Sequence, residues 1–362
     1  MEYVAYIIIA FTSIQLLVAF TNFLFNQKLS KATKSNKLIS VLIPARNEEH
    51  NIRNILYDLM EQEYRNIEVL VFDDQSSDNT GDVVRAIANN HDRIQLISSE
   101  GLPDGWLGKN YSCHSLSQKA KGDFLLFLDA DVRIKNNVIG QTLSFAEKHN
   151  LSLVSVFPKQ IMKNNGEYAT VPIMNYILLT LLPLILVRKL EISSLAAANG
   201  QYMLFEKEKY KKTLPHEVMK SEKVEDIKIA RHYKRNKFKI ACLANESDIK
   251  CRMYASYKES LNGFAKNVTT FFGTSIILTI LFWFITTLGF LPILLIYDTS
   301  GLALYLIVII ITRILVSTTS HQSISKNITY LIIQQLSLGL MIAKSIHNHF
   351  RKQYIWKGRN VH

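Results

Sequence analysis

The chain has 362 residues, 48% of them hydrophobic, so it can bury a full-sized domain and still has apolar sequence left over. Its formal net charge is +12, and many of the basic residues flank apolar stretches, where they would meet anionic lipid headgroups. Because these residues are not interleaved with stacking aromatic residues on one face, the charge favours membrane association and argues against nucleic-acid binding. The cysteines are odd in number and widely spaced, which fits a reducing compartment: Cys113, Cys242 and Cys251.

The first predicted element is a membrane anchor at residues 1–27. Val4 to Phe25 is a nearly uninterrupted apolar stretch that is long enough to span a bilayer as a helix. Only Glu2 is charged before it, and no small-residue cleavage pattern precedes Asn26, so we expect a retained anchor and not a cleaved signal peptide. A run of lysines follows directly: Lys28, Lys31, Lys34 and Lys37. Their positive charge places the next part of the chain in the cytoplasm and the amino terminus outside.

Short apolar runs typical of strands then alternate with segments of helical periodicity. The expected strands are 38–43, ended by Pro44, then 67–72, 94–97 and 124–128. Asn47 is expected to cap the first helix, and further helices are expected over 81–88 and 110–119. This alternation predicts an α/β fold with a parallel sheet and helices on both faces.

Acidic residues follow two of these predicted strands. Asp73 and Asp74 follow the second, and Asp129 and Asp131 follow the fully apolar run 124–128. Since carboxyl ends of parallel strands share one edge of a sheet, both clusters should converge on one crevice. The pair at 129 and 131 could hold Mg²⁺ or Mn²⁺ against a substrate diphosphate, although taken alone it could also be a solvated turn.

Two common nucleotide motifs are missing from the chain. No Gly-x-Gly-x-x-Gly follows the first strand and no Lys-Ser or Lys-Thr phosphate loop occurs, which argues against a dinucleotide oxidoreductase and a phosphate-loop hydrolase. Carboxylates can instead accept hydrogen bonds from a ribose or a base, so the pattern points to a nucleotide-sugar site.

Three segments resemble the successive motifs of the inverting family 2 glycosyltransferases, in order and spacing: 43–49 (IPARNEE), 71–78 (VFDDQSSD) and 128–132 (LDADV). The resemblance covers roughly residues 38 to 265. It implies a GT-A fold with a mostly parallel sheet flanked by helices, and metal-dependent transfer from a nucleoside diphosphate sugar with inversion. Within that family, segments 105–109, 252–254 and 356–359 are similar to membrane enzymes that glucosylate a carotenoid acid.

The resemblance also implies roles for individual residues. Asp73 and Asp74 would bind the base and ribose, Asp131 the divalent metal ion, Mg²⁺ or Mn²⁺, and Asp129 the ribose or the ion's shell. The full set that would bind the nucleotide sugar is Pro44, Ala45, Arg46, Glu48, Asp73, Asp74, Lys109 and Asp129. Further candidates for diphosphate or acceptor contacts are Trp106, Glu225 and Arg252. Lys109 could alternatively be an ordinary exposed lysine, and Trp106 a packed surface aromatic residue.

Inversion by direct displacement needs a base that takes the acceptor's proton. Glu225-Asp226 precedes the helical run 227–231 and resembles the family's Glu-Asp motif, so Asp226 is the candidate catalytic base. The alternative is an acid favoured at a helix amino terminus by the helix dipole. No Gln-x-x-Arg-Trp follows, although processive members of the family carry it, and this absence argues against polymer synthesis.

The remaining apolar stretches predict a second membrane region at residues 266–343, followed by a basic cytosolic tail at 344–362. Residues 268–297 are long enough to span, 302–316 form a short stretch with Arg313, and 328–343 carry Gln334 and Gln335. We expect two spans plus an interfacial or third segment, while four spans in all remain open. Residues 172–187 are a core helix or an interfacial helix.

The resulting hypothesis is a multi-pass cell-membrane glycosyltransferase with a cytoplasmic catalytic domain. It would move glucose from UDP-glucose to a lipid acceptor such as a carotenoid acid. The alternatives are transfer to polyprenyl phosphate or a glycerolipid in cell-envelope synthesis, or a non-enzymatic membrane transport or scaffold protein. Against transport, the apolar segments lack internal symmetry and carry few charges, and the acidic motifs lie outside them.

Overall fold

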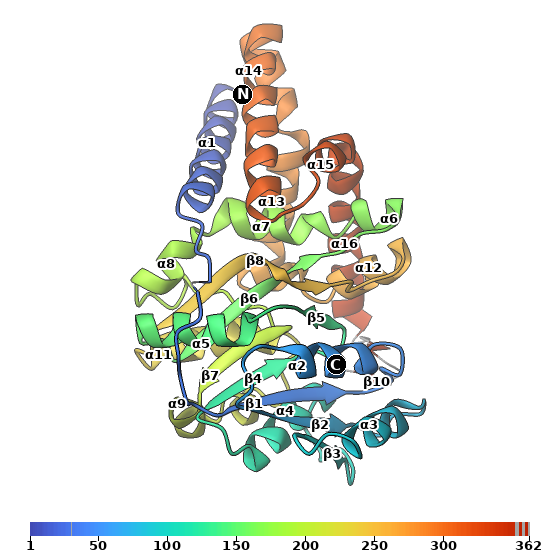
Figure 1. The fold of residues 1–362 in the computed structure, drawn as a ribbon. Coiled ribbons are helices and arrows are strands. Elements are labelled where there is room, and N and C mark those ends of the chain that lie inside the picture. Colours follow the sequence, from blue (N-terminus) through green and yellow to red (C-terminus); the bar gives the residue numbers. More distant parts are fainter. Residues whose placement is uncertain (30, 352–354, 357–358, 361–362) are drawn as a thin grey trace.

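The computed structural model describes residues 1–29, 31–351, 355–356 and 359–360. Within these residues a mixed sheet crosses the middle of the chain in the order β3-β2-β1-β4-β7-β6-β8-β5 (Figure 1). Its strands are β1 (Ile39–Ala45), β2 (Ile67–Asp73), β3 (Ile94–Ser98), β4 (Phe124–Leu128), β5 (Val132–Ile134), β6 (Leu153–Gln160), β7 (Tyr202–Glu206) and β8 (Ile240–Cys251).

Most of the strands run in the same direction. β3, β2, β1 and β4 are parallel neighbours, and β6 and β8 share their direction. β7 runs antiparallel between β4 and β6, and β5 is antiparallel to β8 at the edge. The mostly parallel α/β sheet is therefore confirmed, and all the parallel strands end at one edge.

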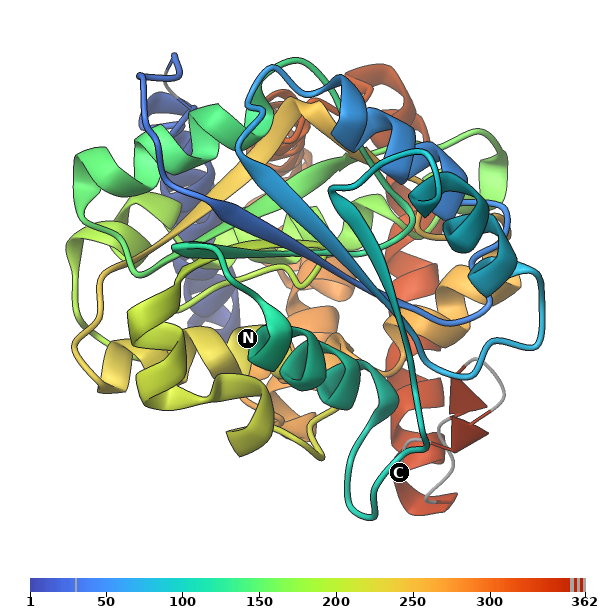
Figure 2. The ribbon, with the colours of Figure 1, turned by 60° about the horizontal axis from the view of Figure 1, so that its bottom comes forward.

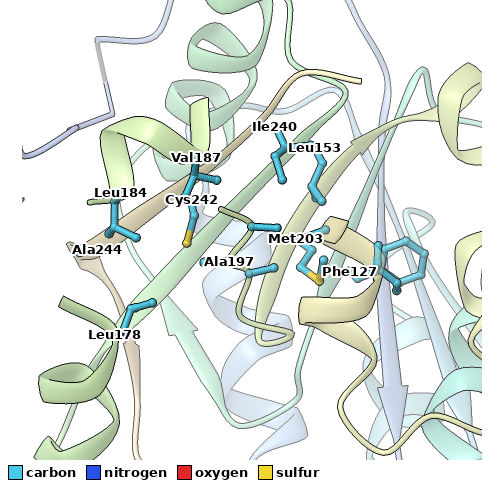
Figure 3. Close-up of a cluster of buried hydrophobic side chains, with 14 of the residues drawn as sticks. Phe127, Leu153, Leu178, Leu184, Val187, Ala197, Met203, Ile240, Cys242 and Ala244 are labelled. Atoms are coloured by element: carbon cyan, nitrogen blue, oxygen red, sulfur yellow. The ribbon is translucent and has the colours of Figure 1, made fainter. Parts of the chain in front are cut away.

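Helices cover both faces of the sheet (Figure 2). Those of the α/β region are α2 (Ile52–Glu61), α3 (Thr80–Ala88), α4 (Gly108–Lys119), α5 (Val138–His149), α6 (Asn165–Tyr168), α7 (Pro172–Leu181), α8 (Leu184–Lys189), α9 (Lys207–Thr213), α10 (Pro215–Val218), α11 (Glu225–Arg235) and α12 (Tyr257–Phe264). One core lies under α2, α3 and α5, and a second lies under α4, α7 and α11. Figure 3 shows part of the second core, where Val187 lies beside Cys242 and Ala197 lies beside Met203.

Two expectations about the first strand and its helix are wrong. β1 does not stop before Pro44 but continues through Ala45. Proline has no backbone N–H to donate to a neighbouring strand. This is tolerated at Pro44 because the pairing of β1 with β4 already ends at Leu42. Asn47 does not cap α2; it has a φ of 54°, which asparagine tolerates in turns, and α2 begins only after Asn51.

The apolar segment 172–187 forms two helices because Pro183 interrupts it. α7 is largely buried and lies against the amino-terminal helix α1 (Glu2–Leu24). Gln15 of α1 donates to the Thr180 hydroxyl (3.2 Å), and Asn22 donates to the Leu179 and Leu182 carbonyls (2.9 Å each). α7 is therefore a core helix that also fixes α1 to the α/β region.

The carboxyl-terminal region contains η1 (Val268–Phe272), α13 (Ile276–Leu288), α14 (Phe290–Thr319), α15 (Ile324–Thr329) and α16 (Leu331–Arg351). Of the described helices, α1 and the continuous segment Ile276–Thr319 are long and apolar enough to cross a membrane by length and composition. Asp298 has non-helical backbone angles and divides that segment into two limbs, which lie beside α1 in Figure 1.

The predicted boundaries of this region need correction. The span expected over 268–297 starts as the 3₁₀ turn η1, and its helix begins at Ile276, after Gly273 and Thr274 with positive φ. The stretch expected to end at residue 316 continues to Thr319.

The fourth apolar segment is part of α16, which packs against α13 and α12 and continues beside the α/β region (Figure 1). Gln334 explains its position, because its side chain accepts from Arg313 (2.8 Å) and donates to the Tyr168 carbonyl (3.0 Å). α16 continues to Arg351, so no break separates residue 343 from the predicted tail. Lys352 and Lys357 of that tail, and Gly358 of the similar segment 356–359, lie outside the described residues.

Candidate active site

The two acidic clusters lie at the same edge of the sheet, as expected. Asp73 is the last residue of β2, and the Asp74 amide donates to the Ala45 carbonyl at the end of β1 (2.9 Å). Asp129 follows β4, and its amide donates to the Gln201 carbonyl just before β7 (3.1 Å). The carboxyl ends of β2, β1 and β4 and the start of β7 thus form one continuous rim.

Hydrogen bonds fasten the loop after β1 to the loop after β2. Arg46 donates to the carbonyls of Asp74 (2.5 Å) and Gln75 (3.1 Å). The Glu48 amide donates to the Thr80 hydroxyl (2.8 Å). The predicted nucleotide-binding residues from these two loops are therefore brought together, with Pro44 and Ala45 directly beneath them in β1.

The Asp73 carboxylate has a tightly defined place. One oxygen accepts from the Ser76 amide (3.0 Å), and a Cβ at Gly81 would lie 2.8 Å from the other oxygen. A side chain at residue 81 would press against this carboxylate and displace it, so Gly81 allows the carboxylate to keep its position. Asp74 is almost completely buried beside it.

Lys109, in the first turn of α4, lies between two carboxylates. Its Nζ is 2.9 Å from Asp129 and 3.3 Å from Glu225. Burial lowers the pKa of Lys109, but the two carboxylates outweigh burial and hold the pKa well above its usual value. Lys109 is therefore a fixed positive charge at the rim, in contrast to the exposed lysine that was the alternative.

Asp226 lies one residue after Glu225, at the start of α11. One of its carboxylate oxygens accepts from the Gly200 amide (2.9 Å) and the other from the Ile227 amide (2.7 Å). Burial, and after it the negative charge of Glu225, raise the pKa of Asp226 to about 7. A carboxylate with such a pKa can accept a proton at neutral pH. Its place at a helix amino terminus is compatible with this role.

Asp131 lies close to the end of β8. Burial first, and then the negative charge of Asp131, raise the pKa of the Cys251 thiol and of the Tyr254 hydroxyl. In the described part of the chain, no three or more His, Cys, Asp or Glu side chains are grouped to hold a metal ion. The carboxylates of Asp129 and Asp131 are hard oxygen donors, the kind that Mg²⁺ and Mn²⁺ accept when other ligands come from substrate.

Two further candidates are engaged elsewhere in this structure. Arg252, which follows β8, binds the buried Glu167 of α6 at 2.7 Å. Trp106 packs against Tyr111 of α4, with ring centroids 5.6 Å apart. Neither contact places these side chains beside Asp226.

Sequence reasoning missed the segment Asn199-Gly200-Gln201. Gly200 supplies the amide that binds Asp226, and a Cβ there would lie 3.1 Å from the Lys109 amine and 3.3 Å from Glu225. The turn pair Asn-Gly before the apolar run 202–205 was the available signal. It marked a turn, but it could not reveal that β7 enters the sheet beside β4.

Comparison with known proteins agrees with this architecture. The family model described as glycosyl transferase family 2 matches residues 40–214. The 4,4'-diaponeurosporenoate glycosyltransferase of Staphylococcus haemolyticus is 24% identical over 90% of this chain and 89% of its own length. The Escherichia coli UDP-Glc:alpha-D-GlcNAc-diphosphoundecaprenol beta-1,3-glucosyltransferase WfgD is 32% identical over 32% of this chain and 44% of its own.

A solved structure supports the same fold. The mannosyltransferase PcManGT from Pyrobaculum calidifontis, in complex with GDP-Man and Mn²⁺, superposes with a TM-score of 0.59 at 16% identity, covering 95% of this chain and 98% of that one. The likeness confirms the predicted GT-A fold. With the matched segment, the ordered motifs and the fold in agreement, residues 40–214 of this chain form a family 2 glycosyltransferase domain.

Proposed function

We propose that this protein is an inverting, metal-dependent, membrane-bound glycosyltransferase that moves glucose from UDP-glucose to a lipid acceptor such as a carotenoid acid. The observation that carries the proposal is Asp226, whose pKa is raised to about 7 and which lies beside the Lys109–Glu225–Asp129 cluster at the carboxyl edge of the sheet. The Staphylococcus haemolyticus relative, similar along 90% of the chain, supports the choice of acceptor.

The donor would lie across the rim from β2 to β4. Asp73 and Asp74 would accept hydrogen bonds from the base and ribose, in a pocket lined by the loops at Arg46 and Glu48. Lys109 would move part of its contact from Asp129 to the diphosphate. Its fixed positive charge would there offset the negative charge of the phosphates. Asp131 and Asp129 would hold Mg²⁺ or Mn²⁺, which when bound supplies positive charge to the leaving diphosphate.

Asp226 would act on the acceptor. As the oxygen of a hydroxyl acceptor attacks the anomeric carbon, Asp226 takes the hydroxyl proton, whereas a carboxylic acid acceptor gives up its proton before the attack and reacts as a carboxylate. The bond from the anomeric carbon to the diphosphate breaks on the opposite side, and its electron pair leaves with the nucleoside diphosphate. The Gly200 and Ile227 amides hold the carboxylate in place for this transfer.

The apolar helices would hold the enzyme at the cell membrane. In this arrangement residues 1–27 are an anchor, 28–265 a cytoplasmic catalytic domain, 266–343 a second membrane region and 344–362 a cytosolic tail. The lysines after α1 support the cytoplasmic orientation. A second candidate acceptor is a polyprenyl-linked lipid, because the Escherichia coli relative carries diphosphoundecaprenol in its name.

The test is the variant Asp226→Asn, which keeps the shape of the side chain and removes its basicity. Transfer of glucose from UDP-glucose to a lipid alcohol, whose hydroxyl proton has to be removed, should fall about 100-fold or more when measured with purified protein, Mn²⁺ and detergent. UDP affinity should be unchanged. Asp92→Asn is the matched control, because Asp92 is exposed and lies before β3, at the opposite edge of the sheet. Full activity of Asp226→Asn would exclude Asp226 as the base.

A further inference from the structure

An apolar pocket of about 160 Å³ lies between α7, α11, η1 and the loop that joins α8 to β7. We call residues 190–201 the α8–β7 loop. Leu178 and Leu181 of α7 form one wall, and Ala196 to Ala198 of the loop form another. Figure 3 shows Leu178 and Ala197 on these walls.

One end of the pocket adjoins the candidate base. Its lining includes Ile227, the residue directly after Asp226, and Ala198, two residues before Gly200. The hydrogen bond from the Gly200 amide to Asp226 (2.9 Å) joins the two elements that carry these lining residues. The pocket is therefore lined by backbone neighbours of the residues that hold Asp226.

The other walls belong to elements that lead to the candidate membrane spans. α7 is fixed to α1 by the Asn22 amide, and η1, which contributes Thr270 and Phe271, leads directly into the apolar segment that starts at Ile276. Many side chains of α1 and of the segment 276–319 are large, apolar and exposed. The pocket thus lies between the base and the surfaces that would meet lipid.

Arg231 is the charged side chain in this lining. It lies one helical turn after Ile227, so both face the pocket from α11. Its Nε is buried, and no residue that the structure describes accepts a hydrogen bond from it. Arg231 as a whole is partly exposed, and the planar donors of its guanidinium group match a carboxylate that enters from the pocket.

We propose that this pocket binds the reacting end of an acceptor whose apolar chain terminates in a carboxylate, and that Arg231 binds that carboxylate. The inference rests on the proposed function, because it takes sugar transfer to a lipid as given. An apolar cavity of this size admits a group about as large as benzene, so it holds the end of the chain while the rest extends toward the apolar helices. One guanidinium balances the single charge of a carboxylate, whereas a neutral glycerolipid would leave it unpaired.

The test uses two ligands with the same polyene chain and different ends, retinoic acid and retinol. Their binding to the full-length protein in detergent is followed by quenching of tryptophan fluorescence. The wild type should bind retinoic acid at least about tenfold more tightly than retinol, as expected for a hydrogen bond to a charged group. Arg231→Met should remove that preference and leave retinol binding unchanged, and Arg231→Lys should keep part of it.

Three controls make the outcome decisive. Arg235→Met, at an exposed position of the same helix, should keep the preference. Ala197→Phe should fill the pocket and weaken the binding of both retinoic acid and retinol. UDP affinity should be unchanged in every variant, which shows that each is folded.

The proposal would be overturned if Arg231→Met lowered the affinity for retinoic acid and for retinol equally. It would also be overturned if the wild type bound retinol as tightly as retinoic acid. Tighter competition by undecaprenyl phosphate or diacylglycerol than by retinoic acid would overturn the choice of a carboxylate. A protein that binds retinoic acid as expected but transfers no sugar would refute the proposed function and leave the pocket assignment standing.

Discussion

Lys109, Asp129, Glu225 and Asp226 come from three separate segments and share one electrostatic environment. Lys109 neutralises part of the charge on Asp129 and Glu225, with which it pairs. Asp226 is held by two backbone amides, and its negatively charged neighbour opposes its ionisation. The same cluster therefore provides a cation for a diphosphate and a carboxylate with a raised pKa for a proton.

The raised pKa of Asp226 predicts a pH profile. The base is protonated below its pKa, so the sugar-transfer rate should rise as the pH increases through about 7. Glu225→Gln removes the adjacent negative charge and should lower the pKa of Asp226, so the rise moves to lower pH. The measurement is the rate of transfer to a lipid alcohol at saturating substrate from pH 5 to 9. Glu222→Gln, whose partner is Lys228, should leave the midpoint unchanged. A midpoint that does not move in Glu225→Gln would contradict this account.

The proposed role of Asp131 as a metal ligand predicts that it affects donor binding only when the metal is present. Asp131→Ala deletes a hard oxygen ligand, so the affinity for UDP in the presence of Mn²⁺ should fall about tenfold or more. With EDTA the variant and the wild type should bind UDP equally. Titration calorimetry under both conditions measures the difference, and a loss of the same size with EDTA would show that Asp131 acts in another way.

At the scale of elements, α11 organises both the base and the acceptor pocket. Besides Asp226 it carries Lys234, whose amine donates to the carbonyls of Leu190 (2.8 Å), Ile192 (3.3 Å) and Leu195 (2.6 Å). These bonds hold the first half of the α8–β7 loop, while the second half is held by Asp226. One helix thus fixes both ends of the loop that lines the pocket.

Lys234→Met should loosen this loop. Loss of charged hydrogen bonds to three carbonyls should cost about 1–3 kcal/mol of local stability. Limited chymotrypsin digestion should therefore cut faster between residues 190 and 195, and the KM for the lipid acceptor should rise. Lys239→Met, at an exposed position before β8, should behave as the wild type. Unchanged cleavage in Lys234→Met would show that the loop is held by other contacts.

At the scale of the whole molecule, the apolar helices and the α/β region are joined by polar contacts as well as by packing. Gln15 and Asn22 of α1 bind α7, and Arg313 of α14 binds Gln334 of α16, which in turn binds the Tyr168 carbonyl. Such directional bonds fix the orientation of the apolar helices relative to the catalytic edge.

The proposed topology predicts opposite accessibility for two positions. Asp298 lies at the turn between the two limbs of Ile276–Thr319. A cysteine introduced by Asp298→Cys should therefore react with a membrane-impermeant thiol reagent in intact cells. Asp92→Cys, in the catalytic domain, should react only after the cells are permeabilised. The native cysteines are all buried, so they should contribute little labelling. Labelling of both positions in intact cells, or of neither, would refute the topology.

Sequence patterns alone predicted the resemblance to family 2, the parallel strands and the carboxylates at the ends of those strands. These features are local, since five buried residues in a row followed by Asp129 and Asp131 define both a strand and the edge at which it ends. The motifs at 43–49, 71–78 and 128–132 were readable for the same reason. Local signals failed at Asn47, because asparagine favours both helix caps and left-handed turns.

Which distant residues meet depends on the tertiary structure. β7 pairs with β4 across more than seventy residues of sequence, and this brings Gly200 to Asp226 and Lys109 between Asp129 and Glu225. The path of α16 along the α/β region also depends on long-range contacts, including Gln334 with Tyr168. Hydrophobic periodicity records which face of an element is buried, but it does not identify the partner that buries it.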